Sequence, residues 1–114
     1  MADCLFCDIA TGRIPCDEVY ADADFLAFRD INPQAPTHVL IIPRRHIGSL
    51  AELTGEDSEL MGKFTIVAAK LAAELGLAPN GYRWVINCGP DAFQTVPHLH
   101  LHLLGGRKLG WPPG

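Results

Sequence analysis

The sequence predicts an α+β fold with a five-stranded antiparallel sheet, one long helix and a short N-terminal helix. Five short segments carry alternating or continuous apolar residues between turn residues, as strands do. A single apolar stripe with helical spacing occupies the middle of the chain. Because most strands follow one another, with the helices at the ends of these runs, we expect an antiparallel sheet with the helices packed on one face.

The N-terminal segments predict a short helix and a hairpin. We expect the helix over residues 4–11, with Asp3 as its N-cap and Gly12 as its end. Residues 18–21 and 25–29 alternate apolar and polar side chains around a short polar turn. This pattern predicts two antiparallel strands joined as a hairpin.

The middle of the chain holds the third strand and the long helix. Residues 38–42 are almost uniformly apolar, which is typical of a strand buried on both faces, and Pro43 ends the run. The long helix is expected over about residues 56–75, with Thr54 as N-cap and Gly76 as the stop. Its apolar side chains share one stripe and comprise Leu60, Phe64, Val67, Ala68, Leu71 and Leu75.

The composition predicts one folded domain spanning residues 1–114. This length is typical of a single domain, and 48% hydrophobic against 19% charged residues suit a globular protein. The net charge of −4 is unfavourable for binding nucleic acid or an anionic membrane. Without a visible signal peptide or membrane-spanning apolar stretch, we expect a cytoplasmic protein whose four cysteines are thiols or metal ligands.

The last two strands are expected at residues 82–87 and 97–104, and the second carries a row of histidines. Successive side chains point to opposite faces of a strand, so three leucines share one face while His98, His100 and His102 share the other. The leucine face is explained as core, whereas three aligned imidazoles indicate a functional site. The outer two lie about 13 Å apart along a strand, too far for one tetrahedral metal to bind all three. A neutral imidazole attacks acyl or phosphoryl centres, and the central His100 is the predicted nucleophile.

Uncharged hydrogen-bonding residues just before this strand favour a phosphorus electrophile. Asn87, Gln94 and Thr95 offer polar side chains, and Gly89 allows close approach of the backbone. Such donors stabilise the charge that develops on phosphoryl oxygens during transfer.

The cysteine pair at Cys4 and Cys7 has the Cys-x-x-Cys spacing. Alone, this spacing fits a redox pair, half of a zinc site, or neither, because a structural zinc needs four ligands. Cys16 and Cys88 have no partner at such a spacing and are expected to be ordinary thiols. His38 lies in the buried third strand and is expected to be a hydrogen-bonded core histidine.

The histidine row resembles the His-φ-His-φ-His-φ-φ signature of the histidine triad (HIT) superfamily, where φ is an apolar residue. Three further segments resemble its Hint branch, the purine nucleoside phosphoramidases: residues 30–38, residues 42–47, and Gly105-Gly106-Arg107 followed by Trp111-Pro112-Pro113-Gly114. The likeness runs from residue 4 to residue 114 and implies a HIT-like fold.

The resemblance implies a hydrolase that cleaves the P–N bond of purine nucleoside 5′-phosphoramidates and needs no cofactor for its chemistry. His100 would attack the α-phosphorus and release the amine, and water would then free the 5′-monophosphate from the nucleotidyl-histidine. His102 and the main chain around His98 would support this step. The implied nucleotide-binding residues are Gln94 and Thr95 near the phosphate and leaving group, Asp30 at the ribose, Phe28 and Ile31 at the base, and Asn87 near the ribose and phosphate.

The resemblance also implies a metal and a partner. Cys4 and Cys7 would bind a structural Zn²⁺ together with His46 and His98. Two copies would form a homodimer with one continuous ten-stranded sheet. The C-terminal tail, residues 105–114 with Trp111, would reach toward the partner's site.

Three positions depart from the usual family pattern. Phe93 replaces a small residue, Thr95 replaces serine but keeps the hydroxyl, and Pro97 replaces an aromatic residue. Phe93 is expected to narrow the leaving-group side of the site. Two alternative functions stay open: hydrolysis of dinucleoside polyphosphates, or a non-catalytic nucleotide-binding or zinc-containing interaction module.

Overall fold

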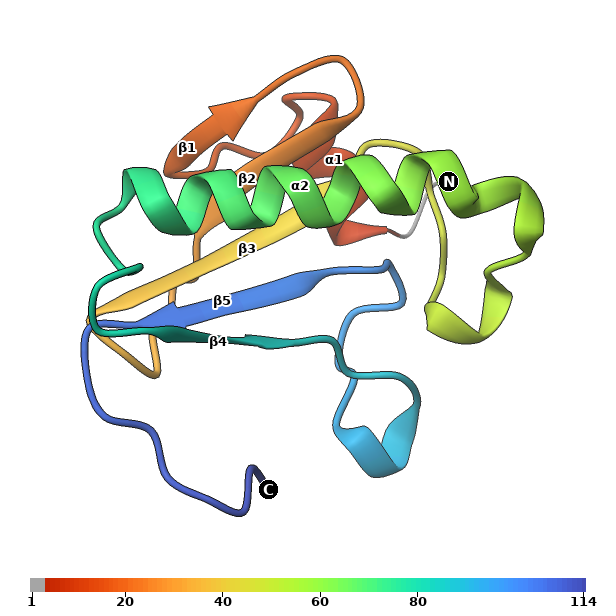
Figure 1. Ribbon diagram of the computed structural model, residues 1–114. Coiled ribbons are helices and arrows are strands. Elements are labelled where there is room, and N and C mark those ends of the chain that lie inside the picture. Colours follow the sequence, from red (N-terminus) through yellow and green to blue (C-terminus); the bar gives the residue numbers. More distant parts are fainter. Residues whose placement is uncertain (1–3) are drawn as a thin grey trace.

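Five strands and two α-helices build the α+β fold that the sequence predicts. The computed structural model describes residues 4–114 (Figure 1). In chain order the elements are α1 (Leu5–Ala10), β1 (Glu18–Ala21), β2 (Phe25–Arg29), β3 (Thr37–Pro43), α2 (Ser58–Glu74), β4 (Tyr82–Val85) and β5 (Leu101–Gly105). Three short 3₁₀ turns complete them: η1 (Leu50–Glu52), η2 (Gly55–Asp57) and η3 (Pro90–Ala92). None of the helices in this part of the chain is both long and apolar enough to cross a membrane.

The strands form one antiparallel sheet in the order β1-β2-β3-β5-β4 (Figure 1). The last strand of the chain therefore lies between β3 and β4, inside the sheet. In the register of β3 and β5, Leu40 lies opposite His102 and His38 lies opposite Leu104. This register puts His38, Leu40 and His102 on the same face, because residues directly opposite each other point the same way.

The two faces of the sheet are covered by different helices. The helix α2 lies across one face of the sheet (Figure 1). Its side chains, such as Phe64 and Leu71, pack there against β2, β3 and β5. Phe6 of α1 packs on the other face with Phe28 and Leu40. The helices therefore do not share one face, contrary to the expectation. The reason is that β3 is apolar on both sides, so its second face also needs cover.

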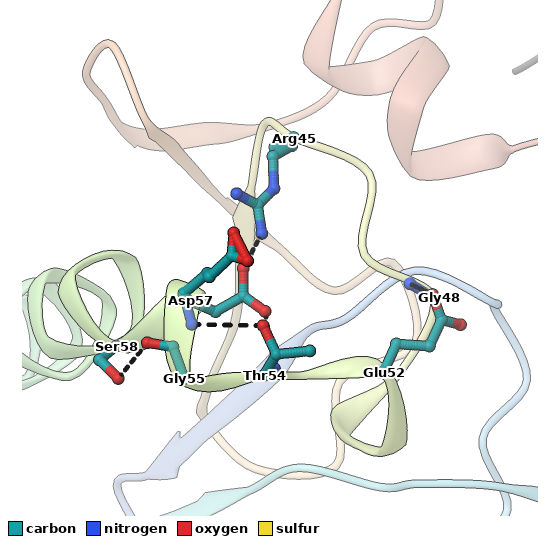
Figure 2. Close-up of polar contacts among 8 residues, drawn as sticks. Arg45, Gly48, Glu52, Thr54, Gly55, Asp57 and Ser58 are labelled. Atoms are coloured by element: carbon teal, nitrogen blue, oxygen red, sulfur yellow. Dashed lines mark hydrogen bonds and ion pairs between the residues drawn. The ribbon is translucent and has the colours of Figure 1, made fainter.

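The long helix begins with a 3₁₀ turn. Thr54 is the N-cap as expected, but residues Gly55–Asp57 form η2 and the α-helix starts at Ser58. Asp57 completes a capping box by accepting the backbone N–H of Thr54, 2.9 Å away, and it also binds Arg45 of the loop after β3 (Figure 2). At α1 the N-cap is Cys4, whose sulfur accepts the Cys7 N–H at 3.2 Å. The expected cap, Asp3, lies outside the described residues.

The final strand is shorter than predicted, because β5 begins at Leu101 rather than at residue 97. Of the three aligned histidines, only His102 lies in the ladder. The ladder stops because its partner β3 ends at Pro43, which has no N–H to donate. The Leu99 N–H instead donates to the Ile47 carbonyl at 2.6 Å. The alternation still holds, since the three leucines are in the core under α2: Leu99, Leu101 and Leu103.

Candidate functional site

A cavity of about 430 Å³ opens on the face of the sheet that carries α1. Apolar side chains of α1, β2 and β3 line much of it, among them Leu5, Phe6, Phe28 and Leu40. Polar groups converge at the side where β5 begins: Asp30, Thr95, His100 and His102. An apolar cavity with a few convergent polar groups is typical of a small-molecule site.

His100 is oriented by the main chain two residues earlier. The residue is 5% exposed, and its Nδ1 lies 2.6 Å from the His98 carbonyl oxygen. A carbonyl only accepts, so Nδ1 carries the proton and Nε2 of the neutral ring keeps its lone pair. Burial lowers the pKa of His100, and the hydrogen bond to His98 opposes this only in part. At neutral pH the ring is therefore a neutral nitrogen nucleophile with a fixed orientation.

His102 receives its orientation from His38 and a backbone amide. The Gln34 N–H lies 3.0 Å from His38 Nδ1, which must accept, so the proton of neutral His38 is on Nε2. That Nε2–H donates to His102 Nδ1 at 2.9 Å, which leaves the proton of His102 on its own Nε2. Burial, with His100 and His38 nearby, lowers the pKa of His102 to about 4. The result is an N–H donor beside the His100 ring, at a ring-centroid distance of 5.0 Å.

His38 belongs to this site, whereas the sequence predicts only a hydrogen-bonded core histidine. It is indeed buried and hydrogen-bonded, but its partner is His102, 64 residues along the chain. Burial lowers the pKa of His38, although Asp30 favours its charged form. The alternation of side chains along β3 could have revealed this. His38 and Leu40 are two residues apart and share a face, and Leu40 lies opposite His102 once β3 and β5 are paired.

Four metal-ligating side chains meet between α1, the loop after β3 and the segment before β5. The donor atoms of Cys4, Cys7, His46 and His98 all lie within 4.8 Å of one another. Cys4 Sγ is 3.3 Å from His98 Nδ1, and Cys7 Sγ is 3.2 Å from His46 Nδ1. Two thiols and two imidazoles are a donor set that suits zinc.

The ring of His98 is oriented for metal binding. It is completely buried, and its Nε2–H donates to the Pro43 carbonyl at 2.8 Å, which leaves the Nδ1 lone pair toward the sulfurs. Such a second hydrogen bond is what metal-bound histidines make in proteins. Burial and the adjacent Cys4 raise the pKa of Cys7 to about 11, so without a metal this thiol is protonated at neutral pH. A metal binds the thiolate and would displace that proton.

A second group within residues 4–114 has similar spacing but different protonation. The donor atoms of Asp30, His38 and His102 also lie within 4.8 Å of one another. Because Gln34 occupies the Nδ1 lone pair of His38, the Nε2 that faces the other two groups carries a proton and has no lone pair for a metal. This group is a hydrogen-bond chain, whereas the group of two cysteines and two histidines fits a metal.

Comparison with known proteins identifies the family. The profile of the HIT domain matches residues 11–109. The chain belongs to the HIT family. A 14 kDa zinc-binding protein of Zea mays is 50% identical over 112 residues, which cover 96% of this chain and 87% of that protein.

Two solved HIT structures show how closely the fold is shared. A HIT family hydrolase from Legionella pneumophila has a TM-score of 0.97 at 54% identity, covering 98% of this chain and 100% of that one. A histidine triad nucleotide-binding protein from Candida albicans has a TM-score of 0.82 at 34% identity, covering 96% of this chain and 83% of that one. The predicted HIT-like fold is therefore confirmed.

Most of the predicted nucleotide-binding residues line the cavity on the α1 face of the sheet. Phe28 is buried on its wall, and Ile31 stands on its rim with the side chain fully exposed. Asp30 also lines it, with one carboxylate oxygen 2.9 Å from the Asn32 N–H and the other 3.4 Å from His38 Nε2. Thr95 contributes an exposed hydroxyl. Asn87, Gln94 and Phe93 are not among the residues that line it.

Phe93 has an unusual backbone for its residue type. It ends η3 in the left-handed region, with φ of 64°, and its side chain is 78% exposed. Bulky residues rarely adopt this region, which glycine adopts without strain. Its predicted effect on the leaving-group side stays a prediction.

Both the oxygen and the nitrogen of the Gln94 side-chain amide form hydrogen bonds with the protein backbone. Its Oε1 accepts the Gly89 N–H at 3.0 Å, while its Nε2 donates to the carbonyls of Gly48 at 2.8 Å and Val96 at 3.0 Å. Both amide hydrogens are therefore used. Gly48 is held from its other side by the Glu52 carboxylate, 3.2 Å from its N–H (Figure 2). Gln94 thus joins the loop after β3 to the segment that leads into β5.

Replacing Gln94 with Glu should lower the free energy of unfolding. The carboxylate still accepts from Gly89 but cannot donate to the carbonyls of Gly48 and Val96, and leaving such groups without partners costs about 1–3 kcal/mol. Urea unfolding measures this change. Asn80→Asp, the same chemical change at an exposed turn residue, is the control and should stay within about 0.5 kcal/mol of the unsubstituted protein. Equal effects of the two substitutions would show that Gln94 does not join the loops.

Proposed function

We propose that this HIT protein hydrolyses purine nucleoside 5′-phosphoramidates through a nucleotidyl-His100 intermediate. The observation that carries the proposal is the pair of opposite tautomers: His100 presents an Nε2 lone pair, and His102 beside it presents an Nε2–H. A nucleophile and a proton donor are the two groups that cleavage of a P–N bond requires. The resemblance to the Hint branch supplies the substrate class.

In the first step the His100 Nε2 lone pair forms a bond to the α-phosphorus, and the P–N bond to the amine breaks. The leaving nitrogen takes the proton from His102 Nε2, so the amine departs neutral. The His102 ring then carries a negative charge, which the His38 Nε2–H on its Nδ1 and the positive His100 ring beside it stabilise until water returns the proton. His100 now carries positive charge, and its Nδ1–H strengthens its hydrogen bond to the His98 carbonyl. Water then attacks phosphorus, the P–N bond to His100 breaks, and one proton of the water returns to His102.

The cavity offers matching surfaces for a nucleotide. Its apolar wall, with Phe28 and Phe6, suits a purine ring. Asp30 and Thr95 line the cavity; Asp30 would accept from ribose hydroxyls, and the Thr95 hydroxyl would donate to phosphate. Gln94 holds the loop after β3 beside the cavity, and the role of Asn87 near the ribose and phosphate stays a prediction. The names of the Legionella and Candida relatives, a hydrolase and a nucleotide-binding protein, are consistent with this assignment.

Replacing His100 with Ala should lower turnover of adenosine 5′-phosphoramidate by at least about 1,000-fold, with AMP binding retained. Rapid acid quench and mass spectrometry of the unsubstituted protein should detect one nucleotidyl group per chain, attached at His100. Turnover by His100→Ala would contradict covalent catalysis. AMP binding without any adduct would favour the binding module, and faster turnover of diadenosine polyphosphates would favour the alternative hydrolase.

We further propose that the group of Cys4, Cys7, His46 and His98 holds a structural Zn²⁺. The donor atoms and the orientation of His98 support this, as does the name of the Zea mays relative. The ion would join α1 to the loop after β3 and fix His98, whose carbonyl orients His100. It would have no part in the reaction itself.

Purified protein should contain one zinc per chain, and Cys4→Ser should contain none. Cys88→Ser, which removes a thiol outside the group, is the control and should keep its zinc. A bound ion at about 100 times its dissociation constant contributes about 2.7 kcal/mol, so chelation should lower Tm by roughly 10 °C in the control but not in Cys4→Ser. Elemental analysis and thermal melting measure both effects. A zinc content of Cys4→Ser equal to that of the control would contradict the site.

We also propose that residues 1–114 form one HIT domain that assembles as a homodimer, with the tail of residues 105–114 directed toward the partner. β4 is an edge strand and so has hydrogen-bonding groups free for a second copy. Ile66 of α2 is 68% exposed and Trp111 of the tail is 82% exposed, which suits burial at an interface.

Light scattering during gel filtration should give twice the chain mass of 12.4 kDa. Ile66→Glu puts a charge at the proposed interface and should shift the mass toward the monomer. Ala23→Glu makes the same charge change in the exposed turn between β1 and β2 and should stay dimeric. A monomeric unsubstituted protein would overturn the assembly.

A further inference from the structure

We propose that Arg107 is a positioning residue that sets the direction of the His38–His102 hydrogen bond. It would do so through Gln34, whose carbonyl it binds and whose N–H reaches His38. The consequence for turnover rests on the proposed function, whereas the effect on the two imidazoles does not.

The guanidinium of Arg107 donates hydrogen bonds to main-chain carbonyls. Its Nε and Nη2 both donate to the Gln34 carbonyl, at 3.2 and 3.0 Å, and its Nη1 donates to Lys108 O at 3.2 Å. Within residues 4–114 no carboxylate lies within ion-pair distance of it. A forked pair of donors on one acceptor fixes direction as well as distance, so this arginine holds residue 34 in place.

The chain is built to bring Arg107 to this loop. Gly106 has a φ of +89°, and a Cβ there would lie 2.9 Å from Pro36 Cβ. Only glycine allows both this backbone and this approach. The segment after β5 therefore passes against the loop before β3, where the Arg107 side chain meets Gln34.

The loop has few other restraints. Residues 31–34 are exposed, and Pro33 and Pro36 have no N–H. The other side-chain bonds of residues 31–36 are local: Asn32 N–H to Asp30, the Gln34 side chain to Asn32, and Gln34 N–H to His38. Within the described chain, Arg107 supplies the hydrogen bonds that reach this loop from outside residues 30–38. Gly106 also lies against Pro36, and Ala35 is buried, but these apolar contacts do not fix the direction of the Gln34 peptide groups.

The Gln34 N–H decides which ring of the pair donates. While it occupies His38 Nδ1, His38 donates to His102 and the free proton of His102 is on Nε2. If His38 instead carried its proton on Nδ1, the hydrogen bond would reverse, and His102 would donate from Nδ1. His102 Nε2 would then be a lone pair and could not protonate a leaving amine. Asp30, 3.4 Å from His38 Nε2, favours the first arrangement, so the test must separate its effect from that of Arg107.

Nitrogen-15 NMR of the imidazoles in the full chain tests this directly at neutral pH, since long-range spectra distinguish protonated from bare ring nitrogens. The unsubstituted protein should show bare Nδ1 and protonated Nε2 in both His38 and His102. Arg107→Ala should shift both rings toward the reversed arrangement, and Arg107→Lys, which keeps the charge but not the fork, should shift them less.

Two controls isolate the role of the Arg107 fork. Arg83→Ala removes a guanidinium that also binds a backbone carbonyl, that of Gly110 at 2.7 Å, and should leave the ring nitrogens unchanged. Gln34→Ala keeps the backbone N–H and carbonyl and should also leave them unchanged. If Arg107→Ala leaves both rings as they are, Asp30 suffices and the proposal is overturned. Should Arg107→Ala fail to fold, Arg107→Lys and Arg107→Gln decide by the same spectra.

Kinetics give the second readout. Arg107→Ala should lower kcat for adenosine 5′-phosphoramidate by about 10-fold, a part of what a general acid contributes, with little change in KM. A rise in KM with kcat unchanged would contradict the positioning role. If the spectra change as expected but the unsubstituted protein does not turn over phosphoramidates, the positioning role stands and the proposed function fails.

Discussion

The register between β3 and β5 is the constraint on which the rest of the molecule depends. It places the last strand of the chain inside the sheet (Figure 1). Leu40 then lies opposite His102. Leu101 and Leu103 of β5 then lie in the core under α2, while His102 faces the cavity on the side of α1. A slip of one residue would exchange the two sets, burying imidazoles without partners in the apolar core. The hydrophobic core and the candidate active site are therefore specified by the same strand pairing.

The end of this ladder leaves backbone carbonyls that orient the rings of His98 and His100. Because Pro43 donates no N–H, the residues before Leu101 leave the sheet, and their backbone groups bind elsewhere. The carbonyl of His98 accepts from the His100 ring, and the carbonyl of Pro43 accepts from the ring of His98. A ring whose Nδ1–H is held by a carbonyl keeps a single tautomer, so the proline that shortens the strand also helps to determine which nitrogen of His100 is free to react.

The sequence was sufficient where periodicity was local and insufficient where contacts join distant segments. Alternation along residues 98–104 predicted the opposite faces of the leucines and histidines, and this holds even outside the ladder. The early end of the strand could not be predicted, because it depends on the position of Pro43 in the neighbouring strand. The place of His38 in the site was missed because its partner His102 lies 64 residues away. The hydrogen bond from Gln94 to Gly48 could not be predicted for the same reason, since these residues are 46 positions apart. The partners of the Cys4–Cys7 pair came from the family resemblance, since the spacing alone left three interpretations open.

The two rings of the candidate active site are held from opposite ends of the chain. His100 is oriented by the main chain of His98, whose side chain belongs to the group of cysteines and histidines at the N-terminal helix. His102 is oriented by His38 and Gln34, and behind them stands Arg107 of the C-terminal segment. In the proposed reaction the first ring must offer a lone pair and the second a proton, and a single change of tautomer in either ring removes that ability. Since an isolated imidazole exchanges between its two tautomers, catalysis of this kind depends less on bringing histidines together than on the backbone groups that deny each ring its second tautomer.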